Sequence, residues 1–110
     1  MSPLSAYRAM WVLVMFDLPV RSKPQRKRAT EFRKHLLESG FQMVQFSIYT
    51  RPCASEAIAD RHSKDLRRAL PPEGSVQVMR ITDKQFQRIE RFLGKRDQAG
   101  PSRPKQLEFF

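Results

Sequence analysis

The chain has 110 residues, enough for one compact domain and too few for two. Its 21 lysines and arginines outnumber its 11 acidic residues, and the net charge of +10 favours a polyanion such as nucleic acid as the partner. Cys53 is the only cysteine, which excludes an internal disulfide and a cysteine-based metal cluster. The longest apolar run, residues 10–16, is too short to span a membrane, so we expect a cytoplasmic protein.

That apolar run is instead the first predicted strand, and its side chains are apolar on both faces. A strand of this kind is covered on both sides. In so small a domain, we expect the second cover to come from another subunit. Asp17-Leu18-Pro19 ends the strand, because proline cannot extend a central strand.

A basic helix is predicted next. Ser22 and Gln25 have capping-box spacing, Gly40 provides the stop, and an apolar stripe faces the core. The segment 21–34 carries seven cations against one acid, Glu31, and phosphate would relieve their mutual repulsion. The ordinary alternative is a solvated helix face. We interpret five of the cations as candidate nucleic-acid contacts: Arg21, Lys23, Arg26, Lys27 and Arg28.

Residues 41–51 alternate with a period of two, which is typical of one long bent strand or of two short ones, and the pattern leaves both open. Ser55 is the predicted cap of a second helix, and a further strand is expected over residues 76–81. Thr82 and Gln85 predict a brief helical turn. Residues 89–93 fit a helix or an edge strand equally well.

The C-terminal end has a different composition. We expect a single domain over residues 1–94, with 1–9 as an N-terminal extension, and a linker over 95–105 that carries Gly, Pro, Ser and charges. Residues 106–110 end in two phenylalanines and are interpreted as a short extra strand that docks on a partner's sheet edge. The alternative is a disordered end.

This order of elements predicts an α+β fold, a ferredoxin-like βαββαβ sandwich. Both helices then lie on one face of the sheet, and the other face is left uncovered. An exposed apolar sheet face predicts a homodimer that assembles through the sheet. We assign Leu13, Met15 and Tyr49 to that dimer interface.

Asp17 is the one carboxylate with suggestive placement, since it follows an apolar strand and precedes the basic helix. It is a candidate catalytic residue and Mg²⁺ ligand, the alternative being a structural turn into Leu18-Pro19. One carboxylate is a sparse magnesium site, but a twofold dimer brings a second copy of Asp17. The metal would then polarise a phosphodiester and activate water. His35 and His62 lack metal-ligand spacing, and there is no glycine-rich phosphate loop.

Four segments in sequence resemble a known family, the smaller CRISPR adaptation protein ("Cas two"), in its type II form. They are residues 11–19 (WVLVMFDLP), 40–49 (GFQMVQFSIY), 71–76 (PPEGSV) and 81–86 (ITDKQF). The resemblance covers residues 10–94. Residues before Tyr7 and after Gly94 match no pattern of the family.

The resemblance implies a ferredoxin-like homodimer whose sheets face each other, working in spacer acquisition with the larger adaptation integrase. Its DNA ligand would be double-stranded spacer precursor, for which the dimer is a scaffold. Family members are also described as metal-dependent endonucleases on RNA or DNA, and Asp17 occupies the position of their proposed magnesium ligand. An RNA-cleaving, toxin-like ribonuclease of the same fold, outside CRISPR adaptation, is the alternative.

Overall fold

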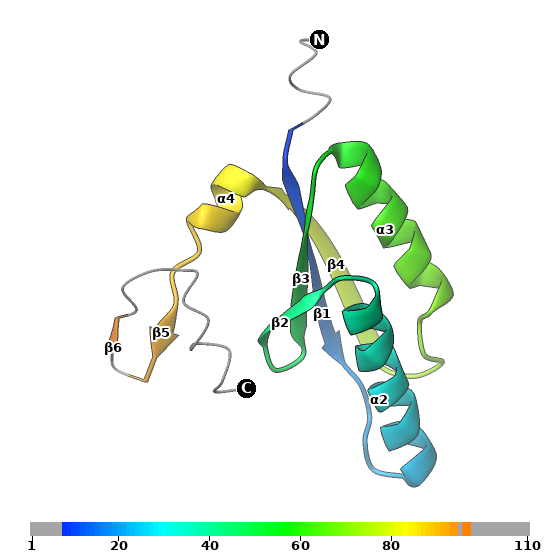
Figure 1. Ribbon diagram of the computed structural model, residues 1–110. Coiled ribbons are helices and arrows are strands. Elements are labelled where there is room, and N and C mark those ends of the chain that lie inside the picture. The colour runs from blue at the N-terminus through cyan, green and yellow to red at the C-terminus, as the bar shows by residue number, and fades with distance from the viewer. Residues whose placement is uncertain (1–7, 95, 98–110) are drawn as a thin grey trace.

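The computed structural model describes residues 8–94 and 96–97 of the chain. They form an antiparallel sheet with helices, followed by a small two-stranded pair (Figure 1). The elements in chain order are β1 (Met10–Asp17), α2 (Lys23–Glu38), β2 (Gln42–Gln45), β3 (Ile48–Cys53), α3 (Glu56–Arg68), β4 (Ser75–Thr82), α4 (Asp83–Gln87), β5 (Phe92–Leu93) and β6 (Arg96–Asp97).

The main sheet has the strand order β2-β3-β1-β4, with β1 antiparallel to both of its neighbours. The helices α2 and α3 lie along the same side of this sheet (Figure 1), and their buried residues join those of β1 in one hydrophobic core. This is the predicted ferredoxin-like α+β arrangement. None of the helices in the described residues is long and apolar enough to cross a membrane.

The two faces of β1 differ in burial. Met10, Val12, Val14 and Phe16 are buried beneath the helices. The alternate residues of the strand, among them Leu13 and Met15, point to the opposite face and are half-buried. The apolar run is therefore a central strand with one face in the core and one face that the helices do not cover.

Residues 41–51 form two short strands rather than one. The chain turns between Gln45 and Ile48, with Ser47 in the left-handed region at a φ of 68°. The carbonyl oxygen of Ser47 accepts a hydrogen bond from the backbone N–H of Phe16 at 3.0 Å. This bond fixes the β2–β3 turn against the end of β1.

The prediction that Tyr49 lies in the dimer interface is wrong. Tyr49 is 3% exposed and is paired in register with Val14, so it faces the helices, and its ring stacks on Phe16. The residues on either side of it, Ile48 and Thr50, lie on the other face, opposite Met15 and Leu13, where Ile48 is half-buried and Thr50 is buried. Alternation in the sequence shows which residues of a strand share a face. The pairing register with the neighbouring strand decides which of the two faces is buried.

Both main helices begin as predicted. The Ser22 hydroxyl accepts from the N–H of Gln25, whose side chain returns the bond to the N–H of Ser22, completing the capping box of α2. Ser55 caps α3 with a single bond, in which its hydroxyl accepts from the N–H of Ile58. The apolar stripe of α2 buries Ala29, Phe32 and Leu36 against the sheet.

The segment after β4 departs from expectation at one point. The predicted helical turn is α4, with a capping box between Thr82 and Gln85. Residues 92–93 then pair with 96–97 as a small β-ladder, so two residues of the predicted 95–105 linker form a strand. Two residues on each side of a turn are enough to form backbone hydrogen bonds with each other. Amino-acid composition alone does not reveal such a short pairing. The docking strand 106–110 and most of the N-terminal extension lie outside the described residues.

His62 on α3 predicts a pH dependence of stability. Its ring packs edge-on against Phe41, and partial burial lowers its pKa below the ordinary 6.5, helped by the charge of Arg51 and opposed by Asp65. The unfolded chain therefore binds this proton more readily. We expect the free energy of unfolding to fall as the pH drops through 6.5, and the fall to be shallower in His62→Gln.

Urea titrations of both proteins at pH 7.5 and 5.5 measure this difference. Asp60 does not contribute in that window, because its hydrogen bond to Lys64 and nearby cations lower its pKa from 3.8. Equal pH dependence in the two proteins would contradict the assignment to His62.

Candidate nucleic-acid interface

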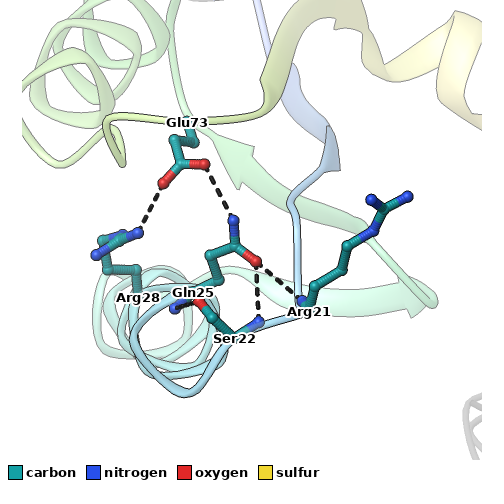
Figure 2. Close-up of polar contacts among 5 residues, drawn as sticks. All are labelled: Arg21, Ser22, Gln25, Arg28 and Glu73. Carbon is teal, nitrogen blue, oxygen red and sulfur yellow. Dashed lines mark hydrogen bonds and ion pairs between the residues drawn. The ribbon is translucent and has the colours of Figure 1, made fainter.

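The start of α2 is tied to the α3–β4 turn by Glu73 (Figure 2). One carboxylate oxygen of Glu73 accepts from the Arg28 guanidinium at 2.7 Å, and the other accepts from the side-chain amide of Gln25 at 3.1 Å. The amide oxygen of Gln25 accepts the backbone N–H groups of Arg21 and Ser22. The basic loop between β1 and α2 is therefore held by Gln25, which is in turn held by Glu73.

Arg26 shapes the same loop from within. One of its terminal nitrogens donates to the carbonyl oxygens of Val20 and Arg21, both at 3.1 Å. Its charge still contributes to the local potential, but its hydrogen bonds hold the loop backbone. Arg28 differs, because the Glu73 carboxylate neutralises it.

The other three predicted nucleic-acid residues present free charge. Arg21, Lys23 and Lys27 are exposed, and within residues 8–94 and 96–97 their side chains have no hydrogen bond or ion pair. Figure 2 shows the Arg21 side chain extending away from the helix. The structure thus divides the predicted set of five into three cations available to phosphate, one that holds the loop and one that is ion-paired.

Asp17 lies at the same end of the sheet, as the last residue of β1. Its side chain is exposed and has no polar partner among the described residues. The backbone of Gly74 packs closely against that of Asp17. Gly74 has a φ of +94°, and a Cβ added to it would lie 2.7 Å from the Asp17 carbonyl oxygen. Only glycine gives the α3–β4 turn both this conformation and this approach.

A magnesium ion is compatible with Asp17 as one ligand. An exposed, unpartnered carboxylate is a hard oxygen donor of the kind that Mg²⁺ uses, together with waters and phosphate oxygens. In the described part of the chain, no group of three or more His, Cys, Asp or Glu residues is placed to hold a metal. A site with three such protein ligands would therefore need a residue from outside that part of one chain, such as a second copy.

The uncovered sheet face carries an apolar patch, which we call the open-face patch: Leu13, Met15 and Met79. Met79 is 50% exposed and lies opposite Leu13 on β4, so it takes the place that was assigned to Tyr49. At one end of this face, Phe86 of α4 stacks on Trp11 with ring centroids 3.7 Å apart, and the indole N–H donates to Asp83 at 2.7 Å. The helix α4 thus covers Trp11 and leaves the patch free.

Sequence reasoning missed Glu73 and Met79. Glu73 lies 45 residues from Arg28 along the chain, and its neighbours indicate only a turn. Met79 stands within an apolar stretch in which the register, and so the face, is not visible from the sequence. Cys53 is buried and free, and burial raises the pKa of its thiol, which agrees with an unreactive residue.

Known proteins similar to this chain point to one family. Residues 10–89 match the family model described as "CRISPR associated protein Cas2". A protein of Flavobacterium psychrophilum named "CRISPR-associated endoribonuclease Cas2" is 50% identical over 107 residues, covering 97% of this chain and 93% of its own length. A protein of Paracidovorax avenae with the same name is 47% identical over 107 residues, covering 97% and 99%.

A solved structure agrees on the fold. It is described as "Crystal structure of cas2", and it superimposes with a TM-score of 0.55 at 22% identity, covering 83% of this chain and 92% of the other. At that identity the likeness concerns the arrangement of helices and strands. The ferredoxin-like topology seen here is the shared feature.

Because Lys27 is unpaired and Arg28 is ion-paired with Glu73, we expect their replacement to affect duplex DNA binding to different extents. Lys27→Ala removes a free charge and is expected to reduce the slope of log affinity against log salt by about 0.9. Arg28→Ala is expected to reduce it less, because Glu73 already neutralises that guanidinium. Fluorescence anisotropy over a salt series measures both slopes.

Glu73→Gln is the matched control, since it frees Arg28 and should steepen the slope. Equal losses in Lys27→Ala and Arg28→Ala would contradict the division of the cations drawn here.

Proposed function

The chain belongs to the Cas2 family of CRISPR-associated proteins, and we propose that it is a dimeric, duplex-DNA-binding scaffold of spacer acquisition with a magnesium-dependent endonuclease site at Asp17. The observation that carries the proposal is the grouping of free cations and an unpartnered carboxylate at one end of β1, on a sheet whose other face is open. The protein acts in the cytoplasm, where its single free cysteine stays reduced.

Binding to double-stranded DNA rests on charge. Arg21, Lys23 and Lys27 project from a loop and helix whose shape is fixed by Glu73 and Arg26. Fixed cations bind phosphates with little loss of side-chain freedom and release condensed counterions. These contacts do not depend on base sequence, as expected for a scaffold that accepts any spacer precursor.

Dimerisation rests on the open-face patch. Two copies related by a twofold axis bury Leu13, Met15 and Met79 against the same residues of the partner. Among the described residues, β4 pairs only with β1, so its outer edge is available to an added strand. We assign the segment 106–110 to such an edge, on the second subunit or at the larger adaptation integrase.

The endonuclease activity rests on Asp17 and on the names of the relatives, which are called endoribonucleases. Asp17 would hold the magnesium ion, together with Asp17 of the second subunit across the twofold axis. When bound, Mg²⁺ would supply Lewis-acid polarisation of the phosphodiester and a more acidic water. Arg21 and Lys23 bind the neighbouring phosphates and hold the strand at the carboxylates. Cleavage of RNA is the second candidate role, favoured by the relatives' names.

Asp17→Asn keeps the size of the side chain and removes the charge that a magnesium ion needs. We expect loss of metal-dependent cleavage of labelled RNA and DNA, with duplex binding changed by less than about twofold, since one surface charge contributes little. Cleavage assays with Mg²⁺ and with EDTA measure the first effect, and anisotropy measures the second.

Cleavage that survives in highly purified Asp17→Asn protein would exclude Asp17 as an essential ligand. Spacer acquisition that survives in cells carrying the same change would separate the scaffold role from the nuclease role.

Leu13→Glu places a charge in the centre of the open-face patch. Burying an unpaired carboxylate costs several kcal/mol, so we expect a monomer at micromolar concentration, as measured by sedimentation velocity. Leu37→Glu is the matched control, because this leucine on α2 is 56% exposed and lies on the helix side. A wild-type protein that sediments as a monomer, or a Leu13→Glu dimer, would contradict this interface.

A further inference from the structure

Phe46 is a conspicuous exposed aromatic residue in the turn between β2 and β3. Its side chain is 63% exposed, yet it is held in place. The Arg33 guanidinium carbon lies 5.2 Å from the centroid of the Phe46 ring and 5.7 Å from that of Phe16, which is buried. Arg33 therefore contacts both rings and links the exposed ring to the core.

The backbone under Phe46 is fixed as well. Ser47 adopts the left-handed conformation, and its carbonyl oxygen is hydrogen-bonded to the N–H of Phe16 at 3.0 Å. An aromatic ring on a fixed turn loses little conformational freedom when a ligand stacks on it. The Phe46 ring is thus preorganised for binding.

Arg33 keeps its hydrogen-bonding capacity. Its guanidinium has five N–H donors in one plane, and in the described part of the chain they have no hydrogen bond or ion pair. These N–H groups are therefore available to a phosphate. Arg26 lies two helical turns away on the same face of α2, about 10 Å along the axis, so positive charge continues from Phe46 toward the basic loop.

We infer that Phe46 and Arg33 form a binding site for an unpaired nucleobase and its phosphate, so that this protein binds single-stranded nucleic acid beside the end of β1. The site rests on the proposed nucleic-acid function and specifies part of its ligand. A ring that stacks bases next to cations that follow the backbone is how proteins bind single strands without sequence preference. In a base-paired duplex the flat faces of the bases are already stacked, so the site discriminates against it.

The position of the site gives it a use. Phe16, whose N–H holds the turn and whose ring lies next to Arg33, directly precedes Asp17. A single strand bound at Phe46 is therefore held at the same end of β1 as the candidate carboxylate. Asp17 lies on the opposite face of β1, so an unpaired segment bound here would reach the carboxylate by passing around the end of the strand.

The test uses the full-length protein and three fluorescent probes: a DNA oligonucleotide, the RNA of the same sequence, and a blunt DNA duplex of the same length. Phe46→Ala and Phe46→Leu both remove the aromatic face, and the leucine keeps most of the apolar volume. We expect each to raise the Kd for both single strands by about 5- to 100-fold, with less than a twofold change for the duplex. Phe46→Trp is expected to retain single-strand affinity.

Phe92→Ala is the matched control, because Phe92 on β5 is a second phenylalanine of similar exposure, 59%, and should leave all three affinities unchanged. A 2-aminopurine base in the DNA strand reports stacking directly, through quenching that Phe46→Ala should abolish.

Three outcomes would overturn the site while leaving the proposed function intact: unchanged single-strand affinity in both Phe46→Ala and Phe46→Leu, equal losses for single strand and duplex, or conversion of a dimer to a monomer by Phe46→Ala. The last result would make Phe46 a protein contact. Failure of the wild-type protein to bind any of the three probes would refute the proposed function itself, and the site with it.

Discussion

The pairing of β1 with β3 on one side and β4 on the other is the constraint on which the structure depends. Because β1 is central and alternates strictly, its even-numbered residues fill the core and its odd-numbered residues form the middle of the open face. The same strand ends at Asp17, between the turn that carries Ser47 and the turn that carries Gly74. The core, the open face and the candidate site therefore share one element and cannot shift independently.

Charge on this molecule is organised by long-range contacts rather than by its total. Like charges three or four residues apart on a helix repel each other and destabilise it. Here, Glu73 neutralises Arg28, Arg26 bonds to the loop backbone, and Arg33 is placed against aromatic rings. Among the described residues, Arg21, Lys23 and Lys27 of this segment are left without a hydrogen bond or ion pair.

The scaffold and nuclease roles make different demands on this geometry. A scaffold needs two rigid basic surfaces at a set separation, which the open-face patch would provide by fixing the dimer. A nuclease needs carboxylates near a phosphodiester, and Asp17 lies on the face of β1 that carries Leu13 and Met15. A dimer through that face would bring the two copies of Asp17 into the same assembly, so one interface would serve both proposed roles.

The sequence by itself determined the features that depend on near neighbours in the chain. The capping boxes at Ser22 and Thr82, the buried stripe of α2, the end of β1 at Asp17 and the order of elements all follow from contacts within a few residues. The tertiary structure alone decided that Tyr49 is buried and Met79 exposed, that residues 41–51 are two strands, and that Glu73 meets Arg28. Strand register and contacts across 45 residues depend on how the whole chain packs, which local patterns do not encode.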